Sequence, residues 1–142
     1  MSLILIALIA AIVSQFIGFI WHGPLFGMTW ARAQDMPDMP KDGKMTPEMK
    51  KRFIWQLVIN FVTNVVMAFT LFYIFSGISM VPFSFFLKLL AVLFVGFILP
   101  VQTIGIIWNG RSAKKQLTIW LISAGFQVIN LLVWLLLFTW LI

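Results

Sequence analysis

Charged residues are confined to two short stretches of this 142-residue chain. Ten of the fourteen lie between Arg32 and Arg52, three lie between Arg111 and Lys115, and Lys88 stands alone. The four charge-free runs are 31, 35, 22 and 27 residues long, and a helix needs about 20 apolar residues to cross a bilayer core. The pattern therefore predicts an all-α polytopic membrane protein with four transmembrane helices in a bundle.

The composition points the same way. The chain is 62% hydrophobic and 10% charged, whereas about a quarter of the residues of a soluble domain are charged. Cysteine is absent, so disulfides and thiolate metal sites are excluded. The net charge of +6 comes from bases that flank the apolar runs. We therefore expect membrane lipids, including anionic headgroups, as partners, and no nucleic acid.

Local signals place the helices within a single integral membrane domain, 1–142. Thr46 is suited to cap a helix whose first position is Pro47. Gly23 and Pro24 predict an elbow after the first helix, and Asn109–Gly110 predicts a turn. The expected helices are about 3–22, 47–75, 83–108 and 117–141, with a connector at about 28–46.

The orientation follows from the bases. With four spans, the loop after the first helix and the loop after the third lie on one side, and together they hold nine of the ten Lys and Arg. The positive-inside rule places both loops in the cytoplasm and both termini outside. Lys88 lies near the outer end of the third helix, where its long side chain can reach the interface.

Several motifs resemble those of a known family. Trp21-His22-Gly23-Pro24-Leu25-Phe26-Gly27 followed by Trp30 is similar to the W-Y-G-P-L-F-G-x-x-W signature of domain of unknown function 1761, a group of small prokaryotic and fungal membrane proteins. The segments around Pro100, Trp108–Ser112 and Ile122–Gln127 are similar too. His22 departs from the family's usual Tyr, and Ser123 from an expected Asn. The resemblance implies a four-span protein, here in the bacterial cytoplasmic membrane, without a known activity.

The first candidate site is the elbow motif, which has two interpretations. Irregular backbone at membrane depth is tolerated when it is buried in protein or lines a wet cavity, and an imidazole such as that of His22 ordinarily titrates near neutrality. His22 is then a ligand or a proton-responsive gate; alternatively, the segment is a structural elbow at the interface. The motif comprises Trp21, His22, Gly23, Pro24, Phe26, Gly27 and Trp30.

The second candidate site is a set of uncharged polar residues inside the spans. Four helices that each point such groups inward make a polar core, because amides that face lipid are costly. This core is either a pathway or a set of bonds that hold the helices together. Its members are Gln15, Asn60, Thr63, Asn64, Gln102, Thr103, Gln127 and Asn130, with His22 at one end.

A third feature concerns packing. Ala10, Ser14 and Gly18 recur at intervals of four and form a ridge of small residues that lets another helix approach closely. The neighbour is either a helix of this chain or the same helix in a second copy. Since a single four-span bundle encloses little space, we expect a homo-oligomer.

The remaining chemistry is limited. No Asp or Glu lies inside a span, which argues against proton- or cation-coupled transport and against catalysis. The repeat Asp35-Met36-Pro37-Asp38-Met39-Pro40, with Met45 and Met49, has soft sulfur atoms, but its hydrophilic, Pro-rich character favours a flexible connector. We expect no enzyme, no bound metal and no cofactor.

Two functions remain. The first is an oligomeric channel or facilitator for water, a small neutral solute or an ion. The alternative is a non-transporting membrane scaffold or accessory subunit, whose polar core only holds the helices together.

Overall fold

The computed structural model describes residues 1–37, 44–78 and 82–141, and every element in these ranges is helical. Four helical stretches are long and apolar enough to cross a membrane, which confirms the predicted number. In chain order, the elements are α1 (Leu3–Ile20), the π-helix η1 (Trp21–Leu25), α2 (Gly27–Ala33), α3 (Pro47–Ser76), α4 (Phe83–Leu93), the π-helix η2 (Phe94–Ile98), α5 (Leu99–Ile107) and α6 (Ala113–Leu141).

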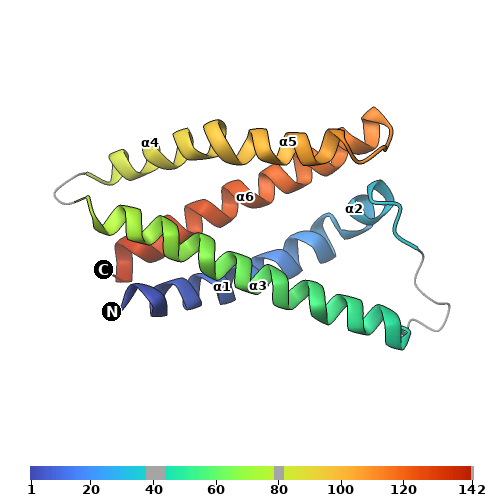
Figure 1. Cartoon of the computed structure of the whole chain (residues 1–142), viewed down its shortest axis with the longest axis horizontal. Coiled ribbons are helices and arrows are strands. Elements are labelled where there is room, and N and C mark those ends of the chain that lie inside the picture. Colours follow the sequence, from blue (N-terminus) through green and yellow to red (C-terminus); the bar gives the residue numbers. More distant parts are fainter. Residues whose placement is uncertain (38–43, 79–81, 142) are drawn as a thin grey trace.

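The two ends of the molecule differ in character. Both chain termini, the end of α3 and the start of α4 lie at one end, which we call the terminal end (Figure 1). The opposite end holds α2, the start of α3 and the turn from α5 to α6 (Figure 1), and we call it the basic end because the two charged stretches meet there. The four spans therefore alternate in direction.

The helices do not pack equally against one another. α6 contacts α1, α2, α4 and α5, whereas α3 packs chiefly along α1. The α1–α3 contact is close because Ala7, Ala10 and Ala68 are fully buried. Towards the basic end, α3 and α5 diverge, and α6 is visible between them (Figure 1).

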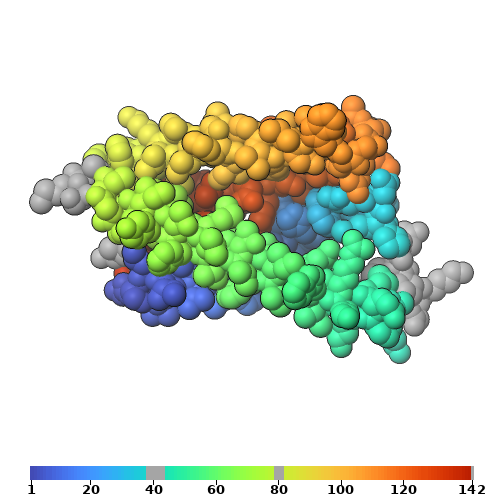
Figure 2. Space-filling view, viewed as in Figure 1, coloured from blue at the N-terminus to red at the C-terminus, as the bar shows by residue number. Residues whose placement is uncertain are grey.

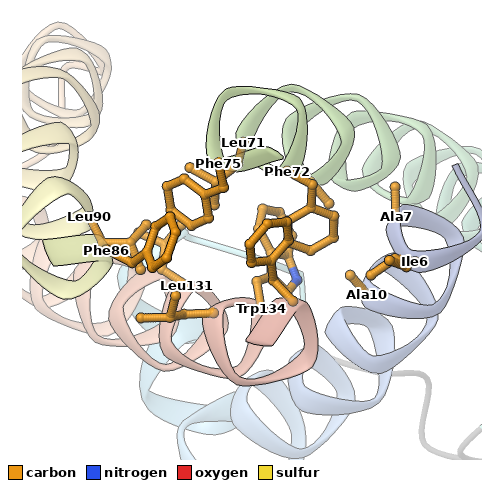
Figure 3. Close-up of a cluster of buried hydrophobic side chains, with 13 residues drawn as sticks. Ile6, Ala7, Ala10, Leu71, Phe72, Phe75, Phe86, Leu90, Leu131 and Trp134 are labelled. Atoms are coloured by element: carbon orange, nitrogen blue, oxygen red, sulfur yellow. The ribbon is translucent and has the colours of Figure 1, made fainter. Parts of the chain in front are cut away.

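The hydrophobic core lies nearer the terminal end and is largely aromatic. Phe75 packs against Phe86 and Phe138, with ring centroids 4.9 and 5.3 Å apart. Trp134 is fully buried among these rings and the small residues of α1 (Figure 3). This cluster joins α1, α3, α4 and α6. It therefore sets how these four helices are placed relative to one another near the terminal end.

Beyond Pro47, which begins α3, the spans contain two prolines, and both lie in or just after a π-helical turn. The predicted elbow at Gly23–Pro24 is not confirmed, because the chain continues through both residues as η1 and breaks only at Phe26, where φ is −123°. The turn η2 immediately precedes Pro100, which lies in the first turn of α5. Proline lacks an N–H and clashes with the preceding turn, and a wider turn at these points accommodates it.

The loops contain both expected and unexpected structure. Thr46 caps α3 as predicted, because its hydroxyl accepts a hydrogen bond from the Met49 N–H at 3.2 Å. The Asn109–Gly110 turn is present, with Gly110 at a positive φ of 72°. The predicted connector 28–46 holds most of helix α2. Part of the Met–Pro repeat, 38–40, lies outside the described residues.

Candidate functional site

A chain of amides connects three of the four spans. Gln15 on α1 donates to the Leu57 carbonyl of α3 at 3.1 Å and accepts from the Asn60 amide at 3.3 Å. Asn64, one turn further along α3, donates to the Asn60 side chain at 3.2 Å and accepts from Asn130 of α6 at 3.5 Å. The chain runs from the half-buried Gln15 through the exposed Asn60 to the fully buried Asn130. Four of the predicted polar residues therefore form one group.

A second polar link lies beside this chain. The Trp134 indole N–H donates to the Ser14 hydroxyl at 2.8 Å, and Ser14 in turn donates to the Ala10 carbonyl at 2.8 Å. Both Ser14 and Ala10 are fully buried inside this chain. The small-residue ridge is therefore in contact with α6 of the same molecule. Gly18 continues this ridge against the ring of Phe126, where an added Cβ would lie 3.8 Å away.

The polar residues of α5 form a separate group. Thr103 donates to the Leu99 carbonyl at 2.7 Å and accepts from the Trp120 indole at 2.9 Å, which links α5 to α6. Both amide atoms of Gln102 are buried without a partner among the described residues, as is the side-chain oxygen of Gln127. Thr63 is exposed on α3. The structure thus does not bring all eight polar residues into one core.

The elbow motif is attached to α6 by its tryptophan. The Trp21 indole N–H donates to the Ile122 carbonyl at 2.9 Å. On the same edge of the ring, the neighbouring carbon Cζ2 lies over Gly125, where an added Cβ would be only 2.9 Å from it. Trp21 also packs on Phe26, with the ring centroids 4.7 Å apart. A residue with a side chain in place of Gly125 would displace the indole.

His22 lies half-buried between two aromatic rings. Its ring centroid is 5.1 Å from that of Trp30 on α2 and 5.2 Å from that of Phe126 on α6. Gly27 permits the close return of the chain, because a Cβ there would be 2.8 Å from the His22 carbonyl oxygen. The remaining motif residues, Gly23 and Pro24, are exposed. The motif therefore builds an aromatic contact between η1, α2 and α6.

At the basic end, the side chain of Asp35 links the end of α2 to the start of α6, a contact that the sequence did not predict. The Asp35 carboxylate accepts a hydrogen bond from Lys115 and forms an ion pair with Arg111, whose Nε lies 3.5 Å away. Arg111 also donates to the Gln34 carbonyl at 2.9 Å. The hydrogen bond from Lys115 and the nearby positive charges lower the pKa of Asp35. These contacts attach the end of α2 to the start of α6.

Metal ligands do not gather in this structure. Across residues 1–37, 44–78 and 82–141, no three His, Cys, Asp or Glu side chains lie close enough together to hold an ion. The groups that do converge are amides, hydroxyls and indoles. Sequence reasoning missed Trp134, Trp120, Phe126 and Gly125 as partners of the polar residues, because an apolar helix gives no signal for which side faces a neighbour.

The fold and the polar groups define a helical protein with four helices suited to a membrane and with uncharged polar contacts between them. The sequence match is more specific. Residues 5–139 match the family described as protein of unknown function (DUF1761), so the chain belongs to this family. Neither a curated protein nor a solved structure matches the chain.

Proposed function

We propose that this protein is a non-transporting membrane scaffold or accessory subunit. The observation that carries the proposal is the amide chain Gln15–Asn60–Asn64–Asn130, in which each side chain bonds to the next across three helices. A water or solute path requires amides that remain open to the permeant. Here Asn64 and Asn130 are both buried and bonded to each other, which supports a role in holding the spans together.

The docking surface of this scaffold is the basic end. It carries the Asp35 ion pairs and the exposed bases Arg32, Lys50 and Lys51. The positive-inside rule assigns this end to the cytoplasm of a bacterial cell and both termini to the outside. Anionic headgroups are the lipid partners of such a surface, and a protein partner would dock on the same side.

The proposal includes no catalytic role and no cofactor. The titratable side chain closest to the amide chain in sequence is His22, and it packs between the rings of Trp30 and Phe126. General acid–base catalysis needs a positioned group within hydrogen-bond reach of the reacting atoms. The amides offer binding contacts only.

A second candidate is the oligomeric channel or facilitator. It is favoured by Asn60 and Thr63, which are exposed on α3 inside a predicted span. In a homo-oligomer, these side chains would line a path between copies, since polar groups on a lipid-facing surface are unfavourable.

Flux and stability measurements on the same variants separate the two functions. The purified protein in proteoliposomes should pass no water, neutral solute or small ion above the level of empty vesicles. Asn64→Leu and Asn130→Leu should lower the free energy of unfolding in detergent by about 0.6 kcal/mol per lost contact. Asn60→Leu removes the exposed amide in the middle of the chain and tests the second candidate. Flux through the unaltered protein that disappears in a folded Asn60→Leu variant would overturn the scaffold and establish the facilitator.

A further inference from the structure

A shallow hollow lies on the first turns of α3, at the basic end of the molecule. Its volume is about 450 Å³, and it is lined by Pro47, Lys50, Lys51, Ile54 and Trp55. All side chains of 50–56 are exposed, and the start of α3 projects beyond the neighbouring helices at the lower right of Figure 2. The hollow is therefore an open surface that one helix provides alone.

The lining residues form two parallel columns on this surface. Lys50 lies four residues before Ile54, and residues at this spacing are neighbours on one face of a helix. In the same way, Lys51 lies four residues before Trp55. Side chains on a helix point towards its N-terminus, which directs both ammonium groups away from the middle of the span. The hollow therefore has a cationic outer half and an apolar inner half.

The boundary between headgroups and hydrocarbon runs through the hollow. The 30 residues of α3 extend over about 45 Å, whereas the hydrocarbon core is about 30 Å thick. About five residues at each end of α3 therefore lie among the headgroups. The last charge at the start of α3 is Arg52, and no charged residue follows before Lys88. Both arguments place the two lysines among the headgroups and the two apolar residues at the edge of the hydrocarbon.

The positive charge of the outer half is not neutralised by a nearby acid. Within 1–37, 44–78 and 82–141, neither Lys50 nor Lys51 forms an ion pair with a carboxylate. The acid of this part of α3, Glu48, does not line the hollow. Two unpaired ammonium groups on one exposed surface favour an anion between them, because opposite charges attract more strongly near a membrane surface than in bulk water.

The inner half continues as an apolar track along α3. Val58 and Val62 follow Ile54 by four and eight residues, so they lie on the same face, and all three are about half exposed. The polar residues Gln56 and Asn60 lie two and six residues after Ile54, on another face of the helix. A hydrocarbon chain that begins at the hollow can therefore follow α3 into the membrane without meeting a polar group.

We propose that this hollow binds one anionic phospholipid, with its phosphate between Lys50 and Lys51 and an acyl chain beside Ile54. Such a lipid presents a negative charge among the headgroups and hydrocarbon directly below it, which is the order of the two halves of the hollow. A soluble phosphate would leave the apolar half empty, and a zwitterionic headgroup brings a positive charge of its own. This lipid is the partner of the basic end in the proposed function, and the site rests on the placement of that end at a membrane surface.

The site is tested with phosphatidylglycerol that carries a photoactivatable diazirine on its acyl chain, close to the glycerol. The full-length protein is reconstituted in phosphatidylcholine nanodiscs, labelled, and mapped by mass spectrometry. Labelling of 50–62 should exceed that by a matched phosphatidylcholine probe more than tenfold, because each of two bases near the surface contributes about fivefold. The lipid-facing residues Val128 and Leu132 of α6 should react equally with both probes. Equal labelling of 50–62 by the two probes would overturn the proposal.

Three substitutions of equal charge test where the headgroup binds. Lys50→Gln and Lys51→Gln should each lower the preference for phosphatidylglycerol about fivefold, whereas Lys51→Arg should retain it. Arg52→Gln is the matched control, because Arg52 is the next exposed base along α3 but does not line the hollow. It should change the preference less than twofold. An equal loss in this control would mean that the basic end attracts anionic lipid without a site.

Three further results would refute the assignment. If soluble glycerol phosphate displaces the probe, the ligand is not a membrane lipid. If a diacylglycerol probe without phosphate shows the same preference, the lysines do not bind the headgroup. If an Ile54→Cys variant forms disulfide-linked dimers in the nanodisc, the occupant is a second copy. Flux through the protein would overturn the scaffold and leave this site intact, whereas loss of the lipid preference would remove the site without bearing on flux.

Discussion

The lack of a side chain at Gly125 makes room on α6 for the Trp21 indole of the family motif. The Trp21 indole reaches from η1 to α6, where its N–H donates to Ile122 and the neighbouring ring carbon Cζ2 rests on the bare backbone of Gly125. A tryptophan at this depth needs both an apolar surface for its ring and a partner for its N–H. The glycine provides the surface by leaving room for the ring.

Gly125→Ala should therefore destabilise the protein. The new Cβ would lie 2.9 Å from Trp21 Cζ2, so the indole must move and its hydrogen bond to Ile122 weakens. Overpacking of this kind costs about 1–3 kcal/mol, measured as a lower free energy of unfolding in detergent. Gly105→Ala is the control, because a Cβ there meets nothing within 4 Å. Equal stability of the two variants would contradict the argument.

At the scale of elements, the end of α2 depends on an unusual aspartate. Asp35 adopts a positive φ of 53°. The Met36 N–H bonds to the Ala31 carbonyl at 3.0 Å, and the Asp35 N–H bonds to the Arg32 carbonyl at 3.3 Å. This is the Schellman arrangement that normally uses glycine. Asp tolerates the left-handed conformation better than most residues. Unlike Gly and Asn, which also adopt it, Asp provides a carboxylate for Lys115.

The contact between Asp35 and α6 should therefore weaken in acid. The bond from Lys115, with the charges of Lys115 and Arg111, lowers the pKa of Asp35 below its usual value of 3.8. Its stabilising effect is fully present above that value and is lost as the pH falls through the lowered pKa of the folded state. The protection factors of the α2 amides in hydrogen exchange, which correct for the slower intrinsic exchange in acid, should fall over that range.

Two substitutions at Asp35 separate the effect of its carboxylate charge from the effect of its backbone conformation. In the Asp35→Asn variant, the α2 amides should have low protection factors at every pH, because the carboxylate is gone. Asp35→Gly should retain the helix end, since glycine favours a positive φ, and yet also lose the pH dependence. An Asp35 carboxyl that titrates at its ordinary pKa by NMR would refute the role of Lys115.

The elements could be predicted only where local chemistry defines them. The start of α3 follows from the Thr46 hydroxyl and Pro47, which act within one turn. Helix α2 was missed because it lies between Gly-Pro and Met–Pro segments, although Met28, Ala31, Arg32 and Ala33 are good helix formers. The π-helical turns also escaped prediction. Their effect at Pro24 and Pro100 is to widen the helix, which no pattern of apolar residues encodes.

The sites were harder to predict than the spans for a related reason. An amide inside an apolar run must find a partner, so the sequence could select Asn64 and Asn130 as candidates. It could not show that they bond to each other, nor that Gln102 has no partner, because the spans are apolar on every side. The direction in which each helix faces is fixed by tertiary packing, here by the aromatic cluster around Phe75 and Trp134.

For the whole molecule, the strongest consequence of the architecture concerns sidedness. The termini, the end of α3 and the start of α4 lie together, and α2 and the turn from α5 to α6 lie at the opposite end (Figure 1). Helices of 23 to 30 residues separate the two ends, which at about 1.5 Å per residue exceeds the thickness of the hydrocarbon core. In a membrane, the two ends must therefore be exposed on opposite sides.

The absence of cysteine from the sequence makes this prediction testable with single-cysteine variants. Ser2→Cys and Ser76→Cys probe the terminal end, whereas Met45→Cys and Ser112→Cys probe the basic end; all four native side chains are exposed. In intact bacterial cells, a membrane-impermeant maleimide should label the first pair, and the second pair only after lysis, because bases are retained in the cytoplasm. Labelling of the second pair alone in intact cells would reverse the orientation but preserve the architecture. Labelling that divides either pair would contradict the four-span arrangement itself, since no alternating path of four helices places Ser2 and Ser76 on different sides.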